Sequence, residues 1–466
     1  MQRNRLYILA AVTLAVTTLG SCQFEDDDNF SESAAQRIDS YNAELKSVLT
    51  SADGGWCIQY FPNSTTRGYN IMASFSESGV CRTACIFGQN NVASVASNAS
   101  ATVFTMSNDD PSLYREAESL YGLDGSNGSV LAMTSYNEIL SAFSAPQLDG
   151  IGLAGDDRFV LLSSADEILT AGIVRMKGSR YGGMVRMVRS SGSWKDELTA
   201  IYDNGQRLFG GAIASFRLEA GDSTMFAVQG QAGILHIGSQ LTADGTGIAS
   251  ADIDRVPFIV TPDGIRFQTE LYKNGVSAIE LNIAADGSAL VSTDGQMRLV
   301  PMLEDYVATH DEILTFDVES LTGEMLVAYN ALTDAMTDNG FAGVKVGLGC
   351  STGVATEGSP VWGLVASGTK RINRVTRTFS FAIGFDVDSS VTGENSLTLE
   401  AEQRDANYLE QVAAASGTYN SLAAPLTSFA SMLEGSYAIS ADDNFAPSVI
   451  SYAAKQAGGH SFRIVK

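Results

Sequence analysis

Residues 56–87 read WCIQYFPNSTTRGYNIMASFSESGVCRTACIF, and apolar and polar side chains alternate along three short runs within them. A period of two is typical of strands with one buried face, whereas a helix repeats every three to four residues. The runs WCIQYF, YNIMASF and VCRTACIF are separated by turn-forming residues, such as those at 76–79. This stretch therefore predicts antiparallel hairpins, and it decides the fold class.

An amphipathic helix is predicted just before these strands, at residues 34–49. Ser33 and Gln36 have the spacing of a capping box, and Gly54-Gly55 follows the helix as a stop. Beyond the hairpins, residues 89–98 are rich in Asn and Ser and predict a polar connection. Further strands are predicted at ATVFTM, SVLAMTS, RFVLLSS, ILTAGIV and GMVRMVR. Residues 34–192 are thus expected to form one helix leaning on a meandering sheet.

The same layout of a helix followed by a meander is predicted for residues 193–304. Residues 194–209 have helical periodicity and Gly210-Gly211 ends them. Strands follow at SFRLEA, MFAVQG, ILHIG, PFIVTP, IRFQTELY, AIELNIA and ALVST. Asp-Gly pairs, which hairpin turns prefer, occur at Asp263-Gly264, Asp286-Gly287 and Asp294-Gly295.

Residues 305–466 are predicted to form a third, C-terminal α+β domain. Helices are expected at residues 324–336, near 407–415 and at 425–433, and a closing hairpin from SYAIS and SFRIVK. The strands between them are VKVGLG, VWGLVASG, RTFSFAIGFDV and SLTLEAE. The fold class is therefore α+β, with predominantly antiparallel β-sheet meanders, a few packed helices and several domains.

The first 21 residues have the pattern of a lipoprotein export signal. Arg3 and Arg5 form a positive region, and the apolar run at residues 6–19 is too short to span a bilayer. It ends in LGSC, where small residues precede Cys22. This resembles the bacterial lipobox, which predicts cleavage before Cys22 and lipidation of its thiol. Several acyl chains would hold the mature protein on a membrane.

Residues 22–33 are predicted to be a lipidated, acidic tether. Its start is made of Gln23 and the four acidic residues Glu25, Asp26, Asp27 and Asp28. Like charges in a row repel one another and keep a segment solvated, so a plain flexible tether is one interpretation. The run also resembles the surface-export signal of Bacteroidota lipoproteins, and we favour that interpretation. It predicts an outer-membrane protein exposed at the cell surface.

Composition disfavours a partnership with nucleic acid. The 466 residues include 29 basic and 53 acidic ones, a formal net charge of −24. Phosphate binding needs clustered Lys and Arg, and no such cluster is visible in the sequence. Solubility of an exported protein is the simpler explanation of the acidity.

Four cysteines lie beyond Cys22, namely Cys57, Cys81, Cys85 and Cys350. Cys81 and Cys85 share one strand and are roughly 13 Å apart, too far to bridge each other. A disulfide from either to Cys57 remains an alternative, but we favour buried free thiols because Cys is common in cores. No histidine has zinc-ligand spacing to them, and no cofactor is predicted.

Several blocks of the chain carry a family resemblance. They are CQFEDDDNFSESAAQRID, GGWCIQYFP, GYNIMASFSESGV, VLAMTSYNEILSAFSAP, GLAGDDRFVLLS with GIVRMKG, and PFIVTPDGIRF. They resemble a Bacteroidota lipoprotein family classed as domain of unknown function 4302, from Cys22 to about residue 301. Members accompany Sus-type outer-membrane transporters and their binding lipoproteins. The resemblance therefore implies nutrient capture at the cell surface, and it implies no catalytic residues.

Enzymatic chemistry has weak support in the residues themselves. Gly349 to Gly353 matches the G-x-S-x-G elbow around Ser351, with Asp386 and His460 following in hydrolase order. The elbow requires a parallel sheet and a helix after the serine, and the surrounding pattern predicts neither. The three histidines, His236, His310 and His460, are widely separated and have no metal-ligand spacing.

Ligand binding is the favoured activity. Flat aromatic rings cover sugar faces at low entropic cost, so the candidate contacts are Trp362, Tyr69, Tyr114 and Tyr121. For each of them a packing role, in a core or at a sheet edge, is the stronger alternative. We therefore expect a non-enzymatic, surface-exposed lipoprotein that binds a glycan or peptide, or a transporter or binding lipoprotein of a nutrient-uptake system. The alternatives are a hydrolase of captured polymer with an unidentified site, and a purely structural partner of a transporter complex.

Overall fold

The computed structural model describes most of the chain beyond the signal and tether. The described residues are 33–93, 102–106, 108–125, 129–144, 153, 155–211, 213–231, 233–242, 247–249, 251–310, 312–351, 361–388, 395–401 and 419–466. Within them strands predominate, a few helices accompany the strands, and every strand pair is antiparallel. The predicted predominance of antiparallel sheet is therefore confirmed.

The strands form three closed eight-stranded barrels, one in each of the ranges 34–192, 193–304 and 305–466. Barrel 1 has the order β1 (Trp56–Phe61), β10 (Met184–Arg189), β9 (Ile173–Gly178), β8 (Arg158–Leu161), β7 (Val130–Met133), β6 (Arg115–Asp124), β3 (Val80–Cys85) and β2 (Tyr69–Phe75). A separate hairpin, β4 (Gln89–Ala93) with β5 (Thr102–Met106), belongs to no barrel.

Barrels 2 and 3 are simple meanders in which each strand pairs with the next and the last closes on the first. Barrel 2 runs β11 (Ser215–Ala220), β12 (Ser223–Gln231), β13 (Ile234–Gly238), β14 (Asp254–Thr261), β15 (Gly264–Lys273), β16 (Val276–Ile283), β17 (Leu290–Val291) and β18 (Met297–Pro301). Barrel 3 runs β19 (Leu314–Phe316), β20 (Ala342–Ser351), β21 (Val361–Ile372), β22 (Val375–Asp388), β23 (Ser396–Ala401), β24 (Gly435–Ala441), β25 (Val449–Ala454) and β26 (Phe462–Val465).

Barrel interiors are filled by side chains. In barrel 1 the rings of Tyr60, Tyr69 and Phe143 pack edge to face, and Trp56 is fully buried. Alternate residues of each strand point inward, so their neighbours line the outer surface. Any binding surface of these barrels is therefore expected on their outer faces and not in a lumen.

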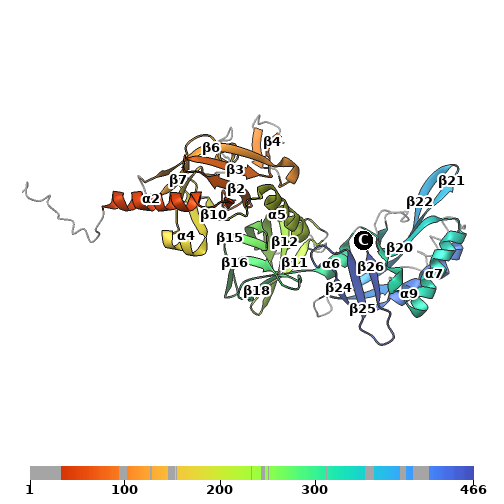
Figure 1. Ribbon diagram of the computed structural model, residues 1–466. Coiled ribbons are helices and arrows are strands. Elements are labelled where there is room, and N and C mark those ends of the chain that lie inside the picture. Colours follow the sequence, from red (N-terminus) through yellow and green to blue (C-terminus); the bar gives the residue numbers. More distant parts are fainter. Residues whose placement is uncertain are drawn as a thin grey trace, which may run out of the picture.

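Helices cover and connect the barrels, as Figure 1 shows. Helix α2 (Ala34–Thr50) packs on barrel 1, where the Trp56 indole N–H donates a 3.0 Å hydrogen bond to the carbonyl of Leu49. Helix α6 (Leu303–Thr309) joins barrel 2 to barrel 3. Helices α7 (Gly323–Asp338) and α9 (Ala423–Leu433) pack on barrel 3.

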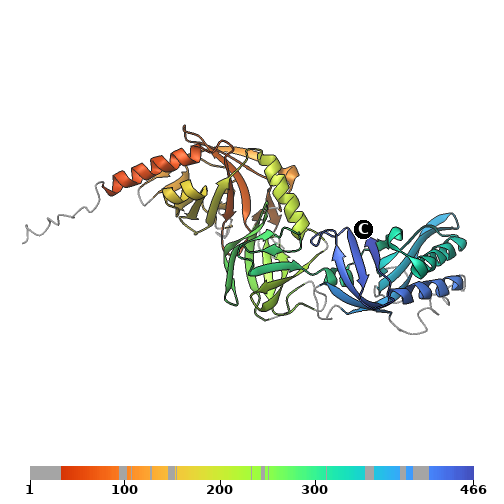
Figure 2. The same cartoon turned by 60° about the horizontal axis from the view of Figure 1, so that its bottom comes forward.

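Helix α5 (Trp194–Phe209) links the first two barrels (Figure 2). Its Leu198 packs with Cys57 and Met72 on the outer face of barrel 1, and Leu208 belongs to the core that barrel 2 shares with barrel 3. The predicted helices at 34–49, 194–209 and 324–336 are confirmed, as is the capping box of Ser33 and Gln36. No helix in the described part of the chain has the length and hydrophobicity of a membrane span.

Three local predictions are wrong. The run ILTAGIV was expected to be a strand, but its first half belongs to helix α4 (Ala165–Ala171). Ser164 and Glu167 form a capping box that starts this helix, and Gly172, with φ of 64°, ends it before β9. The capping box lies before the apolar run and the stop lies within it, so periodicity alone missed the helix.

The predicted polar connection at 89–98 instead begins with β4, and its remaining residues, 94–98, lie outside the described ranges. The final strands β24 and β26 do not pair with each other, because β25 lies between them and pairs with both. The helix expected near residues 407–415 also lies outside the described ranges.

Candidate functional site

A polar cleft of about 400 Å³ lies beside the start of α5. We call it the α5 cleft. Its walls come from the loop after α2, from β2, β3 and β6, and from the first turn of α5, and they consist of Asp53, Gly54, Ser74, Arg82, Tyr114, Glu116, Gly192, Ser193, Trp194, Lys195 and Asp196. Two half-buried rings, Tyr114 and Trp194, face this space among charged groups.

Local sequence signals hold both rings in place. Asp110 caps the short 3₁₀ turn Pro111–Leu113 by accepting a 2.8 Å hydrogen bond from the amide of Ser112, and Tyr114 follows this turn directly. The indole N–H of Trp194 donates a 2.8 Å hydrogen bond to the carbonyl of Gly54. An indole fixed in this way loses little further freedom when a ligand covers it.

The charged groups of the α5 cleft form a connected network. Arg82 pairs with Glu116 at 2.7 Å, and the Tyr114 hydroxyl donates a 2.7 Å hydrogen bond to the same carboxylate. Burial, with the hydrogen bond to Glu116, raises the pKa of Tyr114 to about 12. The hydrogen bonds from Tyr114 and Arg82 lower the pKa of Glu116. At neutral pH the tyrosine is therefore a neutral donor and the glutamate is ionised.

Cations sit against the ring faces. The Arg82 guanidinium lies 5.8 Å from the Trp194 ring centre, and the Lys195 ammonium lies 5.9 Å from that of Tyr114. The site thus offers aromatic surface next to positively charged hydrogen-bond donors and negatively charged acceptors. Sugars and short peptides present matching surfaces, with apolar faces edged by hydroxyl or amide groups.

Of the four predicted aromatic contacts, only Tyr114 lies in this cleft. Tyr69 and Tyr121 are 5% and 6% exposed and belong to the core of barrel 1. The Tyr121 hydroxyl donates a 2.9 Å hydrogen bond to the carbonyl of Ser76. Neither ring has a face open to a ligand in this structure, so they are placed as packing residues.

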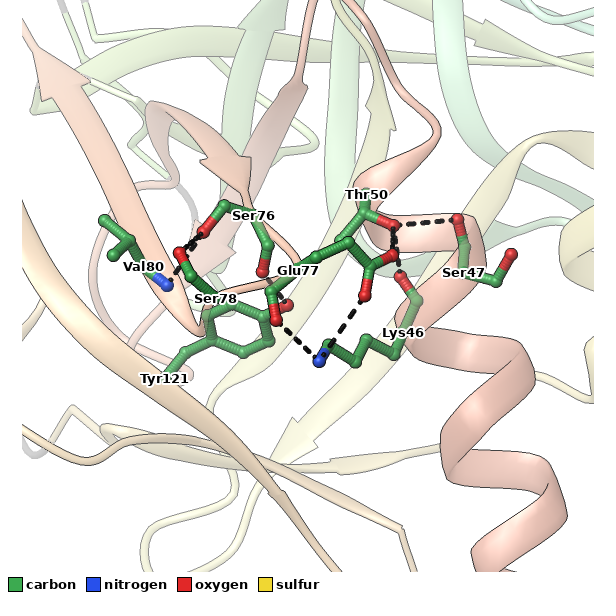
Figure 3. Close-up of polar contacts among 8 residues, drawn as sticks. All are labelled: Lys46, Ser47, Thr50, Ser76, Glu77, Ser78, Val80 and Tyr121. Carbon is green, nitrogen blue, oxygen red and sulfur yellow. Dashed lines mark hydrogen bonds and ion pairs between the residues drawn. The ribbon is translucent and has the colours of Figure 1, made fainter.

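Figure 3 shows how the turn above Tyr121 is held. Glu77, at the tip of the β2–β3 turn, accepts a 2.8 Å hydrogen bond from the Thr50 hydroxyl and forms a 3.5 Å ion pair with Lys46. Both partners come from the C-terminal part of α2. These contacts hold α2 against barrel 1, and none of the three residues lines the α5 cleft.

Trp362 lies far along the chain, on β21 of barrel 3. It is partly buried, and its ring meets that of His310 at a centroid distance of 6.0 Å. The structure therefore does not bring it together with Tyr114. Cys22, Gln23, Glu25, Asp26, Asp27 and Asp28 lie outside the described residues.

The geometry lacks the setting of a serine hydrolase around Ser351. This residue ends β20, which pairs only with antiparallel neighbours, and residues 352–360 are outside the described ranges. Asp386 lies opposite Glu400 on the neighbouring strand, and His460 precedes β26. In the described ranges no three His, Cys, Asp or Glu side chains gather closely enough to hold a metal ion.

Of the residues that line the α5 cleft, sequence reasoning singled out only Tyr114. Trp194 was expected only as part of the helix at residues 194–209, and Arg82 and Lys195 were not singled out. Trp194 and Lys195 meet Tyr114 because α5 packs across β3 and the 3₁₀ turn, whereas Arg82 meets it through Glu116 on the paired strand β6. The one available signal for Trp194 was its place at the first position of the helix, which is an unusual place for a core residue.

A second, smaller cleft of about 240 Å³ lies between barrel 1, α5 and barrel 2. Arg67 and Asp109 form one wall through a two-point ion pair of 2.9 and 2.8 Å, and the Arg67 guanidinium stacks 4.5 Å from the centre of the Tyr69 ring. The amide of Gly68 donates a 3.1 Å hydrogen bond to the carbonyl of Phe258 in barrel 2. This last hydrogen bond crosses the junction between the barrels, and the Arg67 contacts order the barrel 1 side of it.

The free cysteines in barrel 1 agree with the favoured prediction. Cys57, Cys81 and Cys85 are free thiols and all are buried. Burial raises the pKa of both Cys57 and Cys81 to about 12, so their thiols are protonated at neutral pH.

No curated protein matches the chain in a sequence search. A protein-family model does match, over residues 26–284, which is more than half of the chain. The matched range contains barrel 1, α5 and the first six strands of barrel 2, and so the whole α5 cleft. The chain therefore belongs to the family described as Domain of unknown function (DUF4302).

Proposed function

We propose that this protein is a lipid-anchored binding protein of the outer-membrane surface that captures a glycan or peptide for a Sus-type nutrient-uptake system in a Bacteroidota cell. The observation that carries the proposal is the α5 cleft. It combines two fixed, half-buried rings with donors and acceptors on a chain that begins with a lipoprotein-like signal.

The charge pattern of the cleft favours reversible binding of a polar ligand. Arg82 and Glu116 place a donor and an acceptor side by side, which matches the paired hydroxyl groups of a sugar. Both side chains are about half exposed, at 55% and 41%, so a ligand reaches them without displacing the core. The ring of Tyr114 supplies the flat apolar surface that a sugar face covers.

The position of α2 supports an anchor at the barrel 1 end. Its first residue follows the predicted tether directly, and Figure 1 shows this end of the helix directed away from barrels 2 and 3. A lipid on Cys22 would then hold barrel 1 nearest the membrane. Barrel 3 would extend outward toward a partner.

Binding is tested by screening the mature chain, residues 23–466, on glycan and peptide arrays. We expect retention of at least one oligosaccharide or peptide class, with no shortening of that ligand in solution. Tyr114→Ala should lose the retention. Tyr136→Ala is the matched control, because Tyr136 is 68% exposed in the same barrel and lies outside the cleft. Product formation would replace the proposal with a hydrolase.

The anchor is tested separately, by mass spectrometry of the protein from its native membrane and by protease treatment of intact cells. We expect a chain that starts at an acylated Cys22 and is digested from outside. An unmodified Cys22, or full protection from the protease, would overturn the surface assignment while leaving the binding assay unaffected.

A further inference from the structure

A row of four polar side chains crosses the outer face of barrel 1. Gln59 of β1 lies directly opposite Asn70 of β2 and opposite Arg186 of β10, and Arg186 in turn lies opposite Arg175 of β9. Their chain neighbours Ile58, Val185 and Val174 are buried in the barrel core. The alternation of a strand therefore turns all four polar side chains outward.

Barrel 2 faces this row. The Asn70 amide donates a 3.0 Å hydrogen bond to the carbonyl of Val260 on β14. On the next strand pair Arg266 lies opposite Glu280, and these two form an ion pair of 3.2 Å. The seam between the barrels is thus lined by guanidinium groups from both sides. We call Arg175, Arg186 and Arg266 the seam arginines.

Positive charge exceeds negative charge at this seam. Among the described residues, the three seam arginines form an ion pair with one carboxylate, that of Glu280. Arg186 donates a 2.9 Å hydrogen bond to Gln59, a neutral acceptor that is 4% exposed. Arginines placed directly opposite each other across strands repel, so this arrangement costs stability.

The electrostatic surroundings support the same conclusion. Burial lowers the pKa of Arg186, and the neighbouring Arg266 lowers it further. Burial also lowers the pKa of Arg266, against the opposing effect of Glu280. Both shifts reflect burial first, and because guanidinium groups stay protonated, Arg186 and Arg266 remain charged in a partly buried setting. This is unusual in a chain whose net charge is −24 and which has carboxylates in excess.

We infer that the seam arginines bind an oxyanion, a carboxylate or sulfate group of a small ligand. Guanidinium groups form two parallel hydrogen bonds with such groups, and an anion would relieve the repulsion between them. Arg175 is exposed, and Glu280 keeps 35% of its side chain accessible, so the seam is open on one side. The inference is independent of the α5 cleft, whose lining includes none of these residues.

The test is thermal unfolding of residues 23–466 at constant ionic strength, with chloride replaced stepwise by millimolar sulfate or glucuronate. For the wild type we expect the midpoint temperature to rise by about 3 °C once the anion exceeds its dissociation constant roughly tenfold. A midpoint that rises with sulfate alone identifies the ligand as a free inorganic anion. A midpoint that rises with glucuronate identifies it as an acidic sugar. No rise with either anion would overturn the inference.

Variants separate binding at the seam from general salt effects. Arg175→Gln should unfold at the same or a higher temperature than the wild type in chloride, since repulsion is removed, and should lose the anion-dependent rise. Arg186→Lys keeps the charge but loses the planar fork, and should weaken the response. Arg158→Gln is the control, because Arg158 is an exposed residue of the same barrel and pairs with Asp124. An equal rise in Arg175→Gln and Arg158→Gln would contradict the inference.

Discussion

Arg175 and Arg186 lie directly opposite each other on the outer face of barrel 1, two cations in register across β9 and β10. Each residue is followed by a core residue, Met176 or Met187, so neither side chain can turn inward without breaking the barrel pattern. Repulsion of this kind is usually removed unless it has a use. The two arginines and the α5 cleft thus both lie on the outside of barrel 1.

The ion pair of Arg67 and Asp109 should stabilise barrel 1 where it faces barrel 2. Its side chains are only 14% and 24% exposed, so removing one partner leaves a poorly hydrated charge. We expect Arg67→Ala to cost roughly 3 kcal/mol of unfolding free energy. Urea unfolding followed by tryptophan fluorescence in a Trp362→Phe background, which leaves Trp56 and Trp194 as reporters, measures it.

Arg158→Ala is the matched control for this experiment. Arg158 and its partner Asp124 are 50% and 40% exposed, and such surface pairs contribute less than about 1 kcal/mol. An equal loss of unfolding free energy in Arg67→Ala and Arg158→Ala would show that burial of the Arg67 pair does not increase its contribution.

Asp442 should give barrel 3 an acid-sensitive contribution to stability. Although partial burial opposes the change, hydrogen bonds from the Ser448 hydroxyl and from the amides of Val449 and Ser448 lower the pKa of Asp442 to about 2, from an ordinary 3.8. The folded state therefore holds the ionised form more tightly than the unfolded state does. The resulting stabilisation is present above pH 3.8 and is lost as the pH falls toward 2.

We expect Asp442→Asn to unfold at a lower temperature than the wild type at neutral pH, and the difference to vanish as the pH approaches 2. Scanning calorimetry at a series of pH values measures it. Solvent exposure of Asp442 keeps the effect modest. A difference that stays constant with pH would show that the carboxylate charge is not involved.

The thiols of Cys57, Cys81 and Cys85 should be unreactive in the folded protein. All three are buried, and a protonated thiol is a poor nucleophile. Iodoacetamide treatment followed by peptide mass spectrometry should label them only after unfolding in denaturant. Rapid labelling of Cys57 or Cys81 without denaturant, or a disulfide-linked peptide pair in the unreduced protein, would contradict this placement.

Gly178 should be intolerant of a larger side chain. A Cβ atom there would collide with the carboxylate of Asp156, which is 3% exposed and accepts hydrogen bonds from the amides of Arg180 and Tyr181. We expect Gly178→Ala to cost about 1–3 kcal/mol, the range for overpacking. Gly122→Ala is the control, because the nearest atom to its Cβ is the end of the Thr134 side chain. Similar stability of the two variants would contradict the prediction.

Much of the fold could be predicted because local patterns agree with it. Strands such as β9 alternate between buried and exposed positions, and the Asp-Gly pairs at 263, 286 and 294 lie at the turns that join β14 to β15, β16 to β17, and β17 to β18. Barrel closure could not be predicted, since β1 pairs with β10 across more than a hundred residues and no local signal marks that pairing. Helix α4 was missed because its caps, and not its apolar residues, define it.

The candidate site was predicted only in part, for the same physical reason. Tyr114 follows a Pro-containing turn, so its exposure was foreseeable, whereas Tyr69 and Tyr121 fall on inward positions of strands whose register depends on the closed barrel. Trp194 reaches the cleft through the docking of α5, and Arg82 through the pairing of β3 with β6, and both are tertiary contacts. The seam arginines depend on strand register in the same way.

The most direct test of the central claim is the affinity of the array-selected ligand for the wild type and for Tyr114→Ala, measured by isothermal titration calorimetry on the mature chain. Reversible binding that weakens roughly tenfold in Tyr114→Ala, and less in Tyr114→Phe, is the result that we predict. Equal affinity of the wild type and Tyr114→Ala would contradict the assignment of the α5 cleft as the binding site.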